Sequence, residues 1–66
     1  MEHVYVVGSW KRGTFIADRV YDNEQDAINY CDSRKNKKYV WTVMEVPLGG
    51  DWIDWHPVHR TAKSEA

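Results

Sequence analysis

The sequence has 66 residues, of which 42% are hydrophobic and 29% are charged, and its formal net charge is −1. This length allows one small domain and this composition is that of a globular protein, so a multidomain protein and a disordered chain are both excluded. The near-neutral charge argues against a strongly basic nucleic-acid binder and against an acidic nucleic-acid mimic. The chain also holds four tryptophans, four tyrosines and one phenylalanine. So small a core cannot enclose all these rings, so some should lie at the surface or in an interface.

The first two predicted strands form a hairpin. Residues 3–10 (HVYVVGSW) are rich in valine and predict a strand. Residues 11–13 (KRG) predict a three-residue turn, in which the glycine can adopt a positive φ angle. Residues 14–21 return as the second strand, and Asp18 and Arg19 within it indicate a position at the edge of the sheet.

The third predicted element is a helix that begins at Asp22 and ends near Lys35 or Asn36. Asp22 can accept hydrogen bonds from the amides of the first turn, and Gln25 completes the spacing of a capping box. The apolar stripe of this helix lies within residues 27–31 and is narrow. It is therefore not wide enough to cover a broad sheet.

Residues 39–48 (YVWTVMEVPL) form a long apolar run and predict a strand that is apolar on both faces. A tight reversal at residues 49–50 (GG) follows, and residues 51–56 (DWIDWH) predict a short fourth strand or an extended flap. Residues 58–66 are polar and without periodicity, which predicts a flexible tail. We therefore expect one domain over residues 1–57, followed by this tail.

The order of these elements predicts an α+β fold: a three- to four-stranded antiparallel sheet in the order 2-1-3-4, with one helix packed on one face. Four strands about 4.8 Å apart span roughly 15–20 Å, whereas a helix is about 10 Å wide. About half of the sheet surface should therefore stay uncovered. A one-residue bulge would exchange the two faces. The expected faces are Val4, Val6, Met44 and Val46 beneath the helix, and Tyr5, Val7, Trp41 and Val43 on the open side.

The sequence offers weak signals for a metal site and for an enzyme. Acids and histidines at positions 51, 54, 56 and 59, with His3, have side chains that bind divalent metals, but they fit equally well as solvated residues of an edge strand. The single thiol, Cys31, falls on the apolar stripe of the helix, where a cysteine is an inert core residue. We therefore expect neither a cofactor nor catalysis.

The same cysteine count excludes an internal disulfide and fits a reducing cytosol. The N-terminus leads directly into the first predicted strand without a basic leader and an apolar segment, and nothing approaches the ~18 apolar residues of a membrane span. We expect a soluble cytoplasmic protein without a membrane partner.

Two groups of residues suggest binding. The bases after the helix, joined by those of the hairpin turn if that turn folds nearby, lie close to two aromatic residues, a combination that single-strand binders use. Without any binding function, bases at this position would still interact favourably with the negative end of the helix dipole and keep the turn soluble. The tryptophans either enlarge a minimal core or anchor an interface. The predicted partner-binding residues are Tyr5, Trp10, Lys11, Arg12, Arg34, Lys35, Lys37, Lys38, Tyr39, Trp41, Trp52 and Trp55.

Three segments carry a resemblance: residues 4–7 (VYVV), 21–28 (YDNEQDAI) and 43–48 (VMEVPL), the last followed by Asp51-Trp52. In these segments the chain resembles small β-β-α-β domains of uncharacterised bacterial and phage proteins. Its layout is similar to phage-encoded inhibitors of bacterial machinery, including certain anti-CRISPR proteins and an inhibitor of host RNA polymerase. The resemblance spans about residues 3–55 and implies a non-catalytic protein that occupies the surface of a larger target in the bacterial host cell.

We therefore expect a protein-binding module, an inhibitor or regulator whose partner is a larger bacterial protein or protein–nucleic-acid complex. Two alternatives stay open. One is direct binding of nucleic acid through the basic cluster after the helix. The other is a structural homodimer formed by self-association of the open sheet faces.

Overall fold

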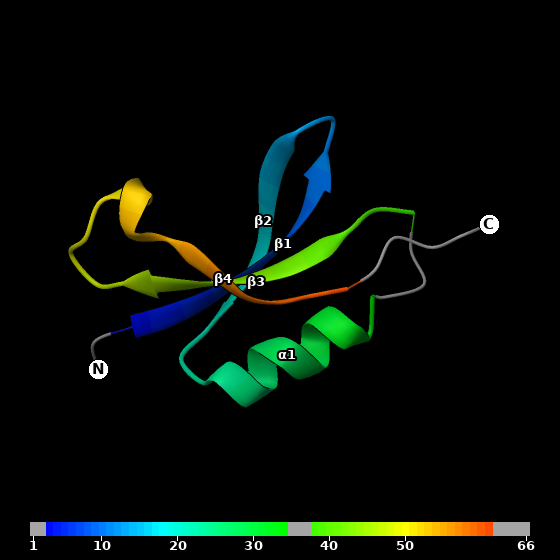
Figure 1. Ribbon diagram of the computed structural model, residues 1–66. Coiled ribbons are helices and arrows are strands. Elements are labelled where there is room, and N and C mark those ends of the chain that lie inside the picture. The colour runs from blue at the N-terminus through cyan, green and yellow to red at the C-terminus, as the bar shows by residue number, and fades with distance from the viewer. Residues whose placement is uncertain (1–2, 35–37, 62–66) are drawn as a thin grey trace.

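The computed structural model describes residues 3–34 and 38–61, except for the side chain of Trp52. Its four strands form one antiparallel sheet in the order β2-β1-β3-β4, and the helix α1 packs against one face (Figure 1). The predicted α+β fold and strand order are therefore confirmed. The elements are β1 (His3–Lys11), β2 (Thr14–Tyr21), α1 (Glu24–Asp32), β3 (Trp41–Pro47), the 3₁₀ helix η1 (Trp52–Asp54) and β4 (His56–Arg60).

The turn between β1 and β2 is tighter than the predicted three-residue connection. Lys11 pairs with Thr14, so the turn itself consists of Arg12 and Gly13. Their φ angles are 55° and 79°, and two consecutive positive values are typical of a type I′ turn, whose twist matches that of the flanking strands. Gly13 adopts this conformation without steric cost, whereas Arg12 adopts it against the preference of an L-residue with a side chain.

Helix α1 is shorter at both ends than predicted. Its N-cap is Asn23 and not Asp22, and the Asn23 Oδ1 accepts a hydrogen bond of 3.1 Å from the backbone N–H of Asp26. The two neighbouring residues are equally good caps by type, so the sequence alone could not separate them. The helix ends at Asp32. The hydroxyl of Ser33, the C-cap residue, donates a hydrogen bond to the carbonyl oxygen of Tyr30 in the last turn.

The helix covers the face of the sheet that the sequence analysis leaves open, so the predicted assignment of the two faces is wrong. Val7 pairs with Val43 across β1 and β3, and both are fully buried against Ala27 and Cys31 of α1. Because the third strand is apolar on both sides, its alternation does not indicate which side faces the helix. The side chains predicted to lie beneath the helix, Val4, Val6, Met44 and Val46, alternate with these and lie on the other face.

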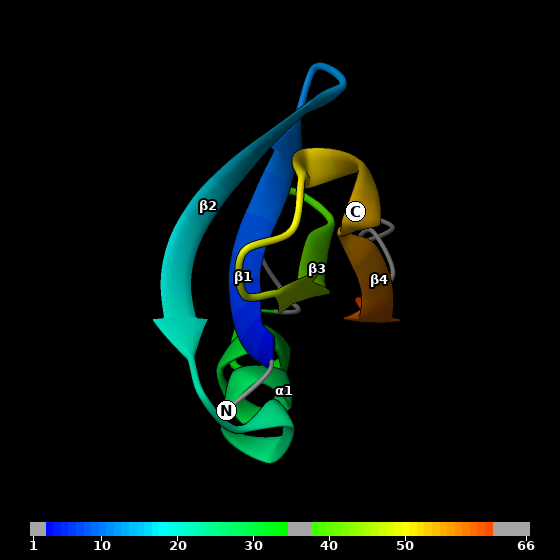
Figure 2. The same cartoon turned by 90° about the vertical axis from the view of Figure 1, so that its left-hand side faces the viewer.

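That other face is partly sheltered by the sheet itself. Near Gly8 the register of β1 and β2 shifts, and the hairpin bends to the side away from α1, where η1 also lies (Figures 1 and 2). A Cβ atom on Gly8 would lie 2.3 Å from the carbonyl oxygen of Ile16 and 2.7 Å from the ring of Phe15, so only glycine fits there. On this face Val6 is 5% exposed and Val46 is 9% exposed. The face opposite the helix is therefore less exposed than predicted.

The fourth strand lies later in the chain than predicted. Asp51 and Asp54 close a turn through two mutual hydrogen bonds, so residues 51–55 do not form a strand. β4 instead continues to Arg60, and the buried Thr61 exchanges hydrogen bonds of 2.8 and 3.1 Å with the backbone of Trp41. The prediction of a flexible tail from residue 58 is therefore wrong for residues 58–61. An edge strand is held by backbone hydrogen bonds and does not need an apolar periodicity, so the polar sequence did not indicate it.

Candidate functional site

A groove of about 360 Å³ lies on the helix face of the sheet, beyond the C-terminal end of α1. Its lining comes from β1, from β2, from Arg34 just after α1, and from residues at and before the start of β3. Among the described residues, three cations and two aromatic rings line it, together with one carboxylate. We call it the basic groove and define it by Lys11, Asp18, Arg34, Lys38, Tyr39 and Trp41.

Two lysines from distant parts of the chain converge on one ring in this groove. The Nζ atom of Lys11 lies 5.0 Å from the ring centroid of Tyr39, and that of Lys38 lies 6.0 Å from it. An ammonium group over an aromatic face is attracted by the ring quadrupole. Both lysines remain exposed while Tyr39 is half-buried. The ring therefore holds two positive charges near each other at the surface.

Arg34 is positioned by aromatic residues. Its guanidinium lies 5.3 Å from the ring centroid of Tyr30 and 5.5 Å from that of Trp41, and its Nη2 donates to the Tyr30 hydroxyl at 2.9 Å. The Tyr30 hydroxyl in turn donates to the carboxylate of Asp18. Arg34 is thus fixed as part of the wall of the groove. A favourable interaction with the helix dipole alone would not require these contacts with Tyr30 and Trp41.

Trp41 belongs to both the groove and the core. Its indole packs against the buried cluster around Val7 and meets the ring of Tyr30 edge-on, with centroids 6.5 Å apart at 85°. Its Nε1 is buried and has no hydrogen-bond partner among the described residues. A substitution of Trp41 would therefore change the stability of the fold as well as the groove.

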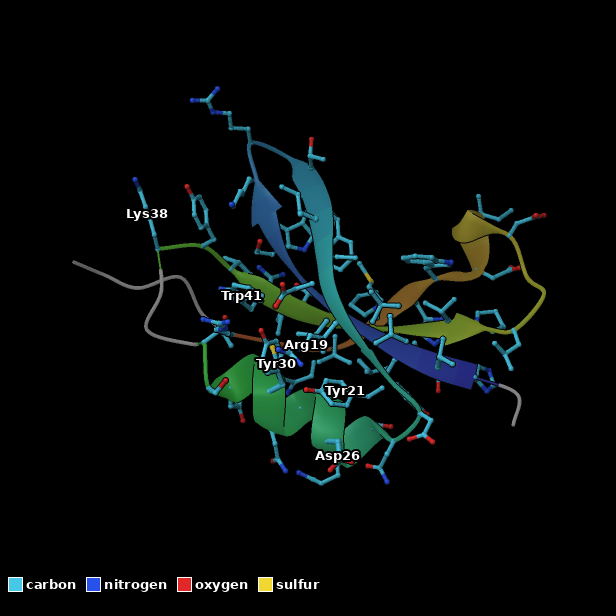
Figure 3. All side chains as sticks on the ribbon, turned by 180° about the vertical axis from the view of Figure 1, so that it is seen from behind. Arg19, Tyr21, Asp26, Tyr30, Lys38 and Trp41 are labelled. Carbon is cyan, nitrogen blue, oxygen red and sulfur yellow. The ribbon has the colours of Figure 1, made fainter. Side chains whose placement is uncertain are left out.

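Charge is separated along the molecule. Figure 3 shows Lys38 at the upper left and Asp26 at the lower edge, in the first turn of α1, where Glu24 also lies. The η1 segment, with Asp54, also lies away from the hairpin tip (Figure 1). A net charge of −1 therefore coexists with a positive end, so the total charge does not argue against an anionic ligand there.

The structure brings together five of the twelve predicted partner-binding residues in the basic groove, and Arg12 follows Lys11 at the adjoining hairpin tip. Three others lie elsewhere. Tyr5 lies on the helix face against the core and donates to Glu45 at 3.3 Å. Trp10 lies on the opposite face, and Trp55 follows η1. Lys35, Lys37 and the side chain of Trp52 lie outside the described residues.

Sequence reasoning missed three residues that support the groove: Asp18 as a hydrogen-bond acceptor, Arg19, and Tyr30. The guanidinium of Arg19 lies 5.1 Å from the ring centroid of Tyr30, as Figure 3 also illustrates. The spacing of Tyr30 and Arg34 by four residues was the available signal, because residues at this spacing are neighbours on a helix and its first turn beyond. No local pattern indicates that β2 lies beside them.

Two of the histidines considered for metal binding, His56 and His59, are paired with carboxylates. His56 Nε2 lies 2.8 Å from Glu45 Oε1, and His59 Nε2 lies 2.8 Å from Asp32 Oδ1. Over residues 3–34 and 38–61, no group of three or more potential ligands is arranged to hold a metal ion. Cys31 is fully buried, and burial raises the pKa of its thiol to about 11.

Within the described part of the chain, no helix has the length and apolar character of a membrane span. No protein-family model, curated protein or solved structure matches this chain.

Proposed function

We propose that this protein is a non-catalytic module that binds single-stranded nucleic acid through the basic groove. Single-strand binders combine cations that contact the phosphate backbone with rings on which the bases stack. The convergence of Lys11 and Lys38 on the ring of Tyr39 carries this proposal. Two ammonium groups thereby lie beside one aromatic ring, and Arg34 adds a third cation to the lining of the same groove.

The hairpin tip supports the same proposal. A left-handed conformation costs an L-residue with a side chain roughly 1–2 kcal/mol, and asparagine is the usual non-glycine residue at this position of a type I′ turn. Arg12 stands there with a φ of 55°. Strain of this kind is retained where the residue serves a function. A positive charge beside the basic groove is such a function.

The experiment is a salt titration of the affinity for a fluorescein-labelled oligo(dT) decamer, measured by fluorescence anisotropy. Three phosphate contacts in the basic groove predict that log K falls against log[salt] with a slope at least as steep as about −2 for a single strand. Lys38→Gln should lower the affinity about three- to tenfold and make this slope shallower by about 0.7.

Gln25→Glu is the matched control for this titration. It changes the net charge by the same amount, but at the exposed first turn of α1. The control should bind like the unmodified protein. Equal losses in the two variants, or an affinity that does not depend on salt, would contradict a groove that contacts phosphates.

A second candidate function is the protein-binding module expected from the sequence, an inhibitor or regulator of bacterial nucleic-acid machinery. The connection between β3 and β4 favours it, because Leu48 is 56% exposed and Ile53 is 67% exposed there. Exposed apolar side chains in one segment suit a protein interface. Binding of a protein that persists at high salt and is lost in Leu48→Ser/Ile53→Ser would support this function over the first. The resemblance to phage-encoded inhibitors stays a prediction.

A further inference from the structure

We infer that the bound strand continues from the basic groove around the end of the sheet and onto the face opposite α1. This inference rests on the proposed function and extends it from one groove to a path of three connected depressions. A pocket of about 260 Å³ at the hairpin tip and a groove of about 250 Å³ on the opposite face form the rest of this path. We call them the tip pocket and the back groove.

Shared walls connect the three depressions. The tip pocket shares Lys38 and Tyr39 with the basic groove. It shares Trp10 and Val40 with the back groove. Among the described residues, the path therefore turns around the start of β3, with lining residues shared at each step. The wall between the tip pocket and the back groove is fixed by a backbone hydrogen bond of 3.0 Å from Trp10 to Val40.

A ring and a cation recur along the path. Tyr39 and Lys38 mark the first passage, and Arg12 adds a charge in the tip pocket. Trp10 then forms a wall of both remaining depressions, and Arg60 supplies the cation of the back groove. Repeated pairing of a stacking surface with a phosphate-binding group is what a nucleic-acid strand requires, since each nucleotide presents one base and one phosphate.

The ring of Trp10 is held in place before any ligand binds. Its Nε1 donates to Thr42 Oγ1 at 3.0 Å, and its ring centroid lies 5.3 Å from that of Phe15. A ring that is already ordered loses little conformational freedom on binding. Each depression alone is at or below the lower end of the usual volumes of ligand pockets, which are about 300–1,000 Å³. The three together suit a short polymer better than one compact ligand.

The experiment is a length series of oligo(dT), from trimer to dodecamer, measured by fluorescence anisotropy with the unmodified protein, Arg60→Gln and the control Gln25→Glu. Arg60 is exposed on the edge strand β4, so its substitution should leave the fold intact. We expect the affinity to rise with oligomer length by more than the statistical gain that a longer strand has from its larger number of overlapping binding positions. Arg60→Gln should lower the affinity for the decamer about fivefold and leave that for the trimer unchanged.

The outcomes separate the two proposals. A longer oligomer offers more overlapping positions at which the protein can bind, and affinities are corrected for this number. If the corrected affinities of trimer and decamer are equal, or if Arg60→Gln has no effect at any length, the path ends in the basic groove and the extension is wrong. If no oligomer binds at any length, the proposed function itself is wrong, and the extension with it. A loss on Arg60→Gln that grows with length, and that Gln25→Glu does not show, supports the path.

Discussion

At the scale of single residues, Arg12 links stability to binding. Arg12→Asn should raise the free energy of unfolding by about 0.5–1 kcal/mol, because asparagine tolerates the left-handed conformation that arginine adopts at a cost. It should also weaken oligonucleotide binding by removing a charge. Urea unfolding measures the first effect. Arg12→Gln removes the same charge without relieving the backbone, so it should bind as weakly but gain no stability. Equal stability of the two variants would refute the strain.

Gly8 is the residue that permits the bend of the hairpin. Gly8→Ala would place a Cβ atom 2.3 Å from a backbone carbonyl oxygen that cannot move without disturbing β2. We expect a loss of unfolding free energy of at least about 2 kcal/mol, at the upper range for overpacking. Thr14→Ala at the exposed start of β2 should change it by less than about 0.5 kcal/mol. Thermal or urea unfolding would show whether the two losses differ in this way.

Cys31 links the core to pH. Its folded pKa of about 11 lies above the ordinary value of 9.0. Below pH 9 the thiol is protonated in both states, and above it the unfolded state loses the proton first. The stabilising contribution of the buried neutral thiol is therefore complete below about pH 9 and decreases as the pH rises toward about 11.

This pH dependence can be isolated by comparison with Cys31→Ala. The urea midpoint of the unmodified protein should fall between pH 8 and pH 10.5 by more than that of the variant, because every other titratable group is common to both. The native thiol should also resist alkylation at pH 8. Parallel midpoints, or rapid alkylation of the folded protein, would show that the thiol is accessible.

At the scale of elements, β4 is an edge strand that is held at its end by Thr61. Thr61→Val keeps the side-chain volume but removes the hydroxyl that accepts from the backbone N–H of Trp41. Because this leaves the N–H of Trp41 without its acceptor, we expect a loss of about 1–2 kcal/mol and faster hydrogen exchange of that amide. Thr14→Val, at an exposed site in β2, is the control. Similar losses in both variants would mean that the hydroxyl contributes nothing specific.

The same scale explains which elements the sequence could predict. β1, β2 and β3 could be located because each is a run of β-branched and aromatic residues between turn residues. Their order in the sheet followed from the hairpin and the crossover connection after it. β4 has none of these features, because its residues HPVHR are mostly polar and its pairing depends on β3. The covered face also could not be predicted, because β3 is apolar on both sides.

At the scale of the whole molecule, the candidate site could be predicted in part. The bases after the helix are contiguous with Tyr39, so their proximity followed from the chain itself. The contribution of Lys11 depended on where the hairpin tip folds, and in the structure its Nζ lies 5.0 Å from the ring centroid of Tyr39. The separation of acids from bases along the helix could be read from the sequence, because residues 22–26 hold three acids and residues 34–38 hold four bases. The opposite placement of Trp10 and Trp41 follows from register, which pairs Trp41 with Ser9.

The most direct test of the account is a titration of the ¹⁵N-labelled protein with an unlabelled oligo(dT) decamer, followed by its ¹H–¹⁵N correlation spectrum. The account predicts that the amides of Lys11, Arg34, Lys38 and Tyr39 shift, together with the indole N–H of Trp41, while the amides of the first turn of α1 and the indole of Trp55 stay in place. Shifts confined to residues 48–55, or no shifts at an excess of oligonucleotide, would contradict it.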